Sequence, residues 1–271
     1  MKKRHKKIAI LTVIIIILFI IFSLAYIFGL LFQEQNKDPN AKGCLSLTFD
    51  DGLETQYNTA YPLLKERGFK ASFFIITNVS SFEGKKLMNY SEILELKESG
   101  FEIGSHSLHH NFMTKINDSE TDKEFSESKK ILEEKGIIVD SFAFPYRDYN
   151  SKLLEKAKSY YTIVRDNYNI NSGGFFINGL SIEKTTDINK TCNDIEKAAN
   201  NNYWLILIIH DVSDSDGKYT VSKENFIKLL DCASKYGIKV ESLKTCKEKS
   251  GILSTMKFFP FNIIKIKKIG Y

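Results

Sequence analysis

Carboxylates and imidazoles, which can act together in hydrolysis, gather in three short segments of this 271-residue chain. Asp50 and Asp51 are adjacent and precede a glycine. His106 and His110 are four residues apart, and His210 follows a run of aliphatic residues. Two imidazoles and one carboxylate can bind a catalytic divalent ion, while a second carboxylate and a third imidazole can transfer protons. The combination indicates metal-assisted hydrolysis.

Each segment taken alone has a simpler structural explanation. Adjacent aspartates before a glycine are common in turns. A surface helix can show the same spacing of histidines, and His210 could be a hydrogen-bonded histidine of the core. The functional interpretation therefore depends on whether the fold brings the three segments together.

Short apolar runs rich in β-forming residues alternate with amphipathic stretches of helical length. This alternation predicts an α/β fold with a parallel sheet covered by helices, and the number of runs favours a closed or nearly closed barrel. The predicted strands are 44–49, 71–77, 101–107, 139–146, 162–165, 180–185, 204–210 and 239–243. The predicted helices are 55–67, 90–99, 119–135, 152–159, 188–201 and 222–236. Four glycines are expected to end helices: Gly68, Gly100, Gly136 and Gly237.

The polar segments all lie at the ends of predicted strands. The paired aspartates follow the first strand, residues 106–110 follow the third, and His210 ends the seventh. Parallel α/β barrels build their active sites at the carboxyl ends of their strands. We therefore expect the three segments to meet at one rim of the barrel.

Four segments resemble, in order and spacing, the motifs of the polysaccharide deacetylases, the NodB-homology domain or carbohydrate esterase family four. They are Thr48-Phe49-Asp50-Asp51-Gly52, His106-Ser107-Leu108-His109-His110, Phe142-Ala143-Phe144-Pro145-Tyr146 and Leu207-Ile208-Ile209-His210. The resemblance extends from about residue 44 to residue 243. It implies a distorted (β/α) barrel that removes N- or O-acetyl groups from sugar polymers with one divalent metal ion.

The resemblance implies a metal site made of Asp51, His106 and His110. Zn²⁺ is the expected ion, with Co²⁺, Ni²⁺ or Mn²⁺ as alternatives. Three protein ligands of this kind leave a coordination position for water and substrate. His109 is a competing ligand, but the family spacing of four residues favours His110.

The resemblance also implies proton-transfer and substrate-binding residues. Asp50 is expected to act as general base and His210 as general acid. The backbone N–H of Tyr146 is expected to stabilise the oxyanion. Leu207 is expected to line the acetyl pocket, and Pro145 to contact the substrate.

The chain departs from the family pattern near the expected base. Many members have an arginine, which positions the catalytic aspartate, where this chain has Ala143. We expect Arg165, at the end of the fifth predicted strand, to replace that arginine, and the adjacent Asp166 to be the partner of His210. Arg147 stands where a glycine is common, which would narrow or charge the groove.

The excess positive charge of the chain lies at its N-terminus. The net charge is +5, and residues 2–7 contain five lysines or arginines without an acid, so the rest of the chain has 33 of each sign. Such a balanced body gives no reason to expect a nucleic-acid partner. The uncharged run at 8–32 predicts a transmembrane helix, with a signal peptide cleaved near Ser23-Leu24-Ala25 as the alternative. The positive-inside rule places residues 1–7 in the cytoplasm and the catalytic domain outside.

The remaining boundaries follow from composition. Residues 33–42 are expected to form a linker, 43–250 the catalytic domain, and 251–271 a basic and apolar C-terminal segment. That last segment is expected to be a terminal strand or flap, with contact to the outer membrane face as the alternative. The four cysteines form no CxxC pair and are expected to be thiols; a disulfide between Cys232 and Cys246 is the alternative.

The expected location directs the expected substrate. A membrane-anchored enzyme outside the cytoplasm would meet N-acetylated cell-wall or surface polysaccharide, and we expect it to hydrolyse N-acetyl groups there. Two alternatives remain open: a non-catalytic glycan-binding homologue, and a metal-dependent hydrolase of O-acetyl esters or of other amides.

Overall fold

A nine-stranded, wholly parallel sheet forms the centre of the fold in the computed structural model, which describes residues 19, 23, 43–166 and 176–249. The strand order is β8-β7-β6-β5-β2-β1-β10-β9, and β13 pairs with β1. The strands are β1 (Cys44–Phe49), β2 (Ala71–Ile75), β5 (Glu102–Ser105), β6 (Ser141–Ala143), β7 (Ile163–Asp166), β8 (Phe176–Asn178), β9 (Leu180–Ser181), β10 (Trp204–Ile209) and β13 (Lys239–Val240). The predicted parallel α/β fold is therefore confirmed.

The sheet is a curled half-barrel rather than a closed barrel. The path of paired strands ends at β8 and β9, which are consecutive in the chain and separated by Gly179 alone. This segment pairs with β7 at its beginning and with β10 at its end. A Cβ atom at Gly179 would lie 2.7 Å from the Ile208 side chain, so a larger residue does not fit where the chain crosses between the two partners.

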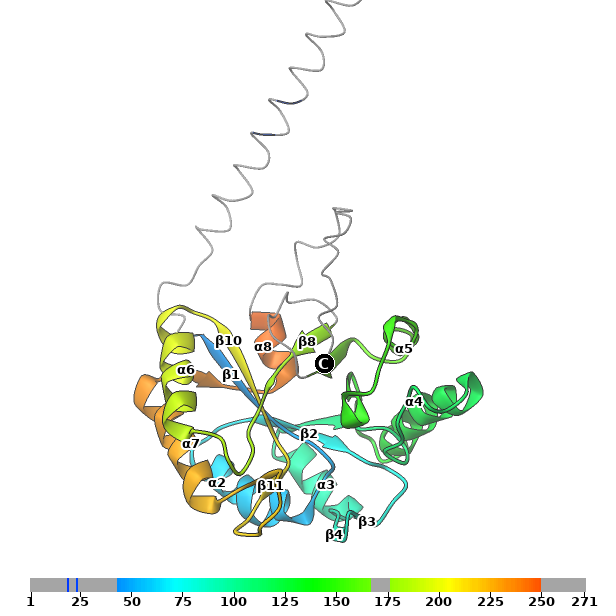
Figure 1. Ribbon diagram of the computed structural model, residues 1–271, viewed down its shortest axis with the longest axis horizontal. Helices are drawn as coiled ribbons and strands as arrows, with labels where there is room; N and C mark the ends of the chain where they lie inside the picture. The colour runs from blue at the N-terminus through cyan, green and yellow to red at the C-terminus, as the bar shows by residue number, and fades with distance from the viewer. Residues whose placement is uncertain (1–18, 20–22, 24–42, 167–175, 250–271) are drawn as a thin grey trace, which may run out of the picture. The chain divides into compact units, whose positions relative to one another are not determined.

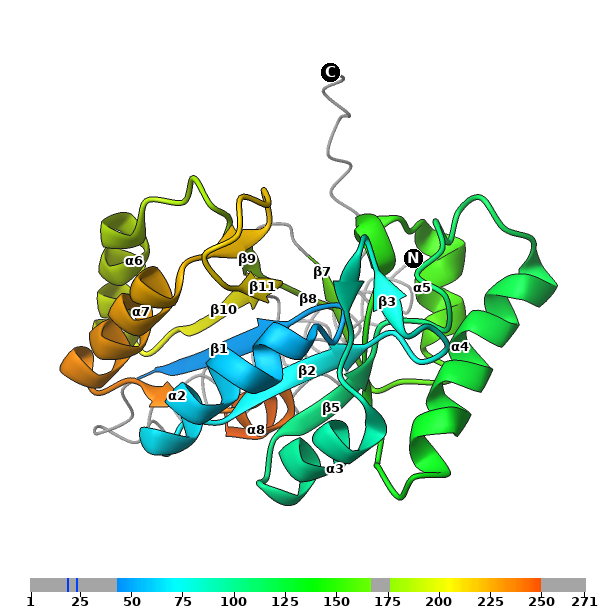
Figure 2. The same ribbon diagram turned by 90° about the horizontal axis from the view of Figure 1, so that it is seen from below.

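Helices surround the outside of the sheet, as Figures 1 and 2 show for α6, α7, α2, α3 and α4. The helical elements are the π-helical turn η1 (Gln56–Ala60), α2 (Tyr61–Glu66), α3 (Tyr90–Glu98), α4 (Asp118–Glu133), the 3₁₀ turn η2 (Pro145–Arg147), α5 (Ser151–Ala157), α6 (Ile188–Asn200), α7 (Lys223–Tyr236) and α8 (Leu243–Lys249). All six predicted helices are present. The four glycines expected at helix ends all have positive φ, between 64° and 81°.

Two faces of the sheet bury different side chains. The outer face packs under the helices in a large core that includes Leu47, Phe49 and Leu207. The inner face forms a smaller cluster with Leu243, the first residue of α8. The sequence analysis did not predict strand β8, helix α8, the antiparallel hairpin of β3 (Ser81–Phe82) and β4 (Lys85–Lys86), or the short parallel pair of β11 (Asp211–Val212) and β12 (Thr220–Val221).

The cysteine prediction was wrong, because the described residues contain two disulfides and no free cysteine. Cys44 bonds to Cys246, and Cys192 bonds to Cys232. The first disulfide joins β1 to α8. Because β13 pairs with β1 and α8 comes directly after β13 in the chain, α8 lies close to β1. The second joins the neighbouring helices α6 and α7. Spacing along the chain does not reveal either contact, and native disulfides of this kind each stabilise a fold by about 2–5 kcal/mol.

The expected N- and C-terminal segments lie outside the described residues. These are the cytoplasmic segment 1–7, the membrane span 8–32, the linker 33–42 and the C-terminal segment 251–271. In the described parts of the chain, none of the helices combines the length and the apolar composition that a membrane crossing needs.

Candidate active site

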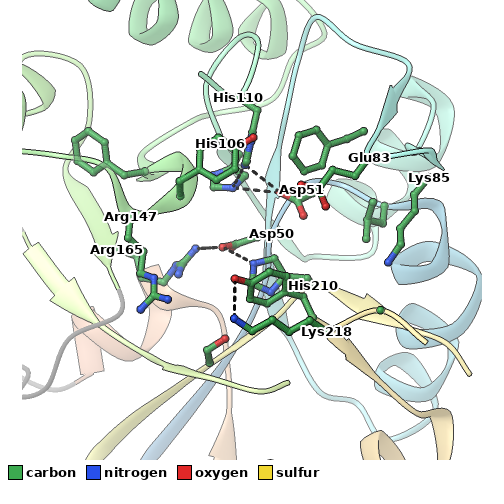
Figure 3. Close-up of a pocket in the computed structure, with 17 residues that line it drawn as sticks. Asp50, Asp51, Glu83, Lys85, His106, His110, Arg147, Arg165, His210 and Lys218 are labelled. Atoms are coloured by element: carbon green, nitrogen blue, oxygen red, sulfur yellow. Dashed lines mark hydrogen bonds and ion pairs between the residues drawn. The ribbon is translucent and has the colours of Figure 1, made fainter. Parts of the chain in front are cut away.

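A cavity of about 380 Å³ opens at the carboxyl ends of the central strands. Figure 3 shows its polar side chains. The aspartate pair follows β1, the histidine pair follows β5, Arg165 lies in β7, and His210 follows β10. Asp50, Asp51, His106, His110 and His210 all line it. The fold thus brings together the three segments that the sequence analysis singled out.

The ligand atoms of Asp51, His106 and His110 converge inside this cavity. The Oδ1 atom of Asp51 lies 3.4 Å from Nε2 of His106 and 3.3 Å from Nε2 of His110, and the two Nε2 atoms are 3.2 Å apart. A tetrahedral site with metal–ligand distances of about 2.0–2.1 Å has edges of about 3.3–3.4 Å. The donor set and its spacing therefore fit a divalent ion such as zinc.

Hydrogen bonding and charge orient these groups toward a cation. The Nδ1–H of His106 donates to the Ala143 carbonyl at 2.8 Å, which leaves its Nε2 lone pair for a metal ion. Burial alone would lower the pKa of His106, yet the carboxylates of Asp50 and Asp51 raise it. Burial would raise the pKa of Asp51, but its interactions with the His106 and His110 imidazoles hold it far below its usual range. The site is therefore arranged for positive charge.

Aromatic rings fix the second histidine. The His110 ring lies between Phe82, with centroids 4.3 Å apart, and Tyr146, at 4.4 Å. Burial lowers the pKa of His110, which favours the neutral imidazole that a metal ion binds. The backbones of Asp51, His110 and Tyr146 have φ values of 75°, 62° and 53°. Left-handed conformations of residues other than glycine are strained, and such strain clusters at functional sites.

Asp50 is bound by Arg165. The Arg165 guanidinium donates to both carboxylate oxygens of Asp50, at 2.6 Å to Oδ2, and both residues are buried. Burial would raise the pKa of Asp50, but Arg165, followed by His106 and His210, holds it below its ordinary value. Arg165 is the register partner of Ala143 in the ladder between β6 and β7. Its side chain therefore starts from the strand beside the position where many family members have arginine.

His210 lies on the other side of Asp50 from Arg165, as Figure 3 shows. Its Nε2 is 3.8 Å from Oδ2 of Asp50, and its buried Nδ1 has no hydrogen-bond partner in the described parts of the chain. The side chain of Asp166, the partner expected from the sequence, lies outside the described part of the structure.

Two residues that were predicted to contact the substrate do not line the cavity. Leu207 does not line the cavity; its side chain is fully buried in the outer core. Successive strand residues point to opposite faces, so Leu207 and His210, three positions apart, cannot share a face, whereas Ile208 can. Pro145 is also buried and does not line the cavity. It opens the turn η2, which carries Tyr146 and Arg147 to the cavity wall.

Other residues of the site escaped the sequence analysis. The side-chain amide of Gln56 donates to the backbone carbonyls of Asp50 and His210, the latter at 2.8 Å, and so ties the loops of the base and the acid together. Lys85, which lines the cavity, forms a 2.6 Å ion pair with the buried Asp211. Nothing distinguishes Gln56 in the sequence, because an isolated polar residue at the start of a helical stretch is ordinary.

The comparison with protein families identifies this arrangement. Residues 37–162, which contain the aspartate pair and the histidine pair, match the family model described as polysaccharide deacetylase. This stretch of the chain belongs to the polysaccharide deacetylase family. Over 132 residues the deacetylase domain is 30% identical to protein YxkH of Bacillus subtilis (strain 168), covering 47% of this chain and 45% of that protein.

Two further relatives place the domain in context. Peptidoglycan-N-acetylmuramic acid deacetylase PdaC of B. subtilis (strain 168) is 29% identical over 129 residues, which is 46% of this chain and 26% of PdaC. The chain thus matches less than half the length of either curated relative. The Xyl-CE4 domain of a multidomain xylanase from the hindgut metagenome of Trinervitermes trinervoides has a TM-score of 0.56 at 21% identity, covering 78% of this chain and 92% of that domain. This likeness shows that the fold shared with that domain extends beyond residues 37–162.

Proposed function

We propose that the protein is a metal-dependent polysaccharide deacetylase that hydrolyses N-acetyl groups of cell-wall or surface glycans. One observation carries this proposal: Asp51, His106 and His110 converge next to an Asp50 carboxylate that a buried arginine holds. That arrangement provides a metal site and a base in one cavity. The similarity to a protein named peptidoglycan N-acetylmuramic acid deacetylase supports an N-acetylated glycan as substrate.

Zn²⁺ is the proposed ion, since two imidazole nitrogens and one carboxylate oxygen suit it, and Co²⁺, Ni²⁺ or Mn²⁺ could take the same donors. When bound, such an ion supplies a Lewis acid for the acetyl carbonyl and lowers the pKa of water. Asp51, His106 and His110 would hold it. The chain's own residues then bind and orient the substrate and move the protons.

Asp50 accepts a proton from the attacking water, because its carboxylate is ionised and oriented by Arg165. His210 faces the same carboxylate and donates a proton to the leaving nitrogen, so the products are acetate and a free amine. The backbone N–H of Tyr146 stabilises the oxyanion, a type of contact worth about 10²- to 10³-fold in rate.

Acetate release from isolated glycans tests the proposed activity. We expect the full-length chain, purified in detergent and supplied with Zn²⁺, to release acetate from peptidoglycan fragments or a chitin oligomer. Acetylated xylan, an O-acetyl ester, is the matched comparison substrate. Acetate release from xylan alone would show that the protein hydrolyses O-acetyl esters and not N-acetyl amides. Glycan binding without acetate release from any substrate would show that the protein is a non-catalytic glycan-binding homologue.

We also propose that the deacetylase domain is anchored to the membrane and lies outside the cytoplasm. The basic residues 2–7 followed by the uncharged run 8–32 favour one membrane span with a cytoplasmic N-terminus. The two disulfides support the same location, since disulfides form and persist in oxidising compartments and are rare in the cytosol.

Fractionation of cells tests the location. We expect the chain to remain with carbonate-washed membranes, to lose its catalytic domain when protease is added outside intact cells, and to show no free thiols when alkylated without reductant. A chain in the medium would indicate the cleaved signal peptide. A chain that is protected from protease and carries four free thiols would contradict the proposal.

A further inference from the structure

A buried carboxylate that the proposed reaction does not use lies beside the metal-binding loop. Glu124 belongs to α4 and is only 3% exposed. It shares the buried side of this helix with Thr121, Phe125 and Ser128, at the spacing of an inward-facing stripe. A charged side chain in such a place is destabilising unless its oxygens are hydrogen-bonded. Its partners therefore indicate what it does.

Among the described residues, the Glu124 carboxylate accepts four hydrogen bonds, and all four come from residues 108–111. Its Oε2 accepts from the backbone N–H groups of Leu108, at 2.9 Å, and His109, at 3.0 Å. Its Oε1 accepts from Nδ1 of His109, at 2.8 Å, and from the side-chain amide of Asn111, at 3.0 Å. Because His110 lies within this segment, a single carboxylate fixes the chain on both sides of a metal ligand.

These contacts also explain why the extra histidine does not compete for the metal ion. The side-chain amide of Asn78 donates to Nε2 of His109 at 2.9 Å, and Nδ1 of His109 donates to Glu124 at 2.8 Å. Both ring nitrogens are therefore occupied outside the cavity, which His109 does not line.

The loop held by Glu124 has a strained backbone. Ser107 and His110 have φ values of 70° and 62°, in the left-handed region that residues other than glycine avoid. The hydroxyl of Ser107 accepts a 2.9 Å hydrogen bond from the His110 N–H within the loop. Strained conformations persist only where the surroundings fix them, and the four bonds to Glu124 connect this loop to a helix of the main fold.

We propose that Glu124 is a positioning residue that holds the loop so that His110 faces Asp51 and His106 before a metal ion arrives. This inference rests on the metal site of the proposed function. Prearranged ligands do not have to be ordered when the ion binds, so binding is tighter. Partners that orient metal ligands contribute about 10- to 100-fold in metal affinity.

Zn²⁺ affinity tests this role directly. It is measured on the metal-free, full-length chain by competition with a chelating indicator. We expect Glu124→Ala to raise the Zn²⁺ dissociation constant by about 10- to 100-fold. Glu124→Gln should have a smaller effect, because its amide oxygen still accepts from the two backbone N–H groups and only the hydrogen bonds of Oε1 with His109 and Asn111 are lost. The matched control is Glu127→Ala, which removes an exposed glutamate from the same helix and should leave the affinity unchanged.

The outcomes separate this inference from the proposed function. A merely structural role would lower the melting temperature without changing the Zn²⁺ affinity or the visible spectrum of the Co²⁺-loaded chain. Glu124→Ala that binds Zn²⁺ within twofold of wild type would therefore overturn the role of Glu124 alone. If Glu124→Ala does not fold, the same criterion applies to Glu124→Gln. Wild-type protein that binds no Zn²⁺ would overturn the proposed metal site, and this inference with it.

Discussion

Replacement of Asp50 by asparagine is expected to lower kcat/KM for acetate release about 10³-fold. Asparagine keeps the size of the side chain but cannot accept the proton of the attacking water. General-base catalysis contributes about 10²- to 10⁴-fold, and 10³-fold corresponds to about 4 kcal/mol in the activation free energy. Because Asp51, His106 and His110 are unchanged in the variant, it should bind as much Zn²⁺ as wild type.

The control for this variant is Asp231→Asn. Asp231 also pairs with an arginine, Arg67, at 3.0 Å, but it is on the surface of α7. Loss of an exposed pair of this kind changes stability by less than about 1 kcal/mol, and the rate should be that of wild type. An Asp50→Asn variant that binds a full equivalent of Zn²⁺ and hydrolyses at the wild-type rate would rule out Asp50 as the base.

Replacement of Arg165 by alanine is expected to lower kcat/KM about 10²-fold at neutral pH. The variant leaves the Asp50 carboxylate buried without its cation, and burial then raises the pKa of Asp50. Since Arg165 lowers that pKa in the wild type, the acidic limb of the pH–rate profile should move to higher pH in the variant. A kinetic pH profile and a thermal melt measure the two consequences, because breaking a buried ion pair also destabilises the fold by about 3–5 kcal/mol.

A relocated arginine provides the decisive comparison. Ala143 and Arg165 are register partners on adjacent strands, which lie about 4.8 Å apart. We therefore expect the double variant Ala143→Arg/Arg165→Ala to recover part of the lost activity and to move the acidic limb back. Arg67→Ala, which breaks the surface pair with Asp231, is the matched control and should leave the profile unchanged. If Arg165→Ala leaves the profile where it is in wild type, Arg165 does not position Asp50.

The sequence predicted the fold class because periodicity is local. The alternation of apolar runs and amphipathic stretches gave the parallel sheet, and all six expected helices are present. Elements without a periodic signal were missed. The two- and three-residue strands β3, β4, β8, β11 and β12 are too short to show alternation. Helix α8 begins at Leu243, where the expected strand 239–243 ended, and the rest of it was assigned to no element.

The chemical identity of the site was also readable along the chain. The resemblance to the family motifs assigned the metal site to Asp51, His106 and His110, and the ends of strands are where a parallel sheet gathers such residues. The error at Leu207 was avoidable, since the two-residue period of a strand already separates it from His210. Glu124 also left a signal, a charge on the buried stripe of an otherwise amphipathic helix.

The sequence by itself determined which groups could carry out the chemistry, because residue types and their spacing near strand ends are local properties. Only the tertiary structure decided how these groups are paired. Lys85 reaches Asp211 across 126 positions, and Cys44 reaches Cys246 across 202. Such contacts depend on strand order, on ladder register and on which helices pack side by side. These are set by the packing of the whole domain, and short-range patterns do not record them.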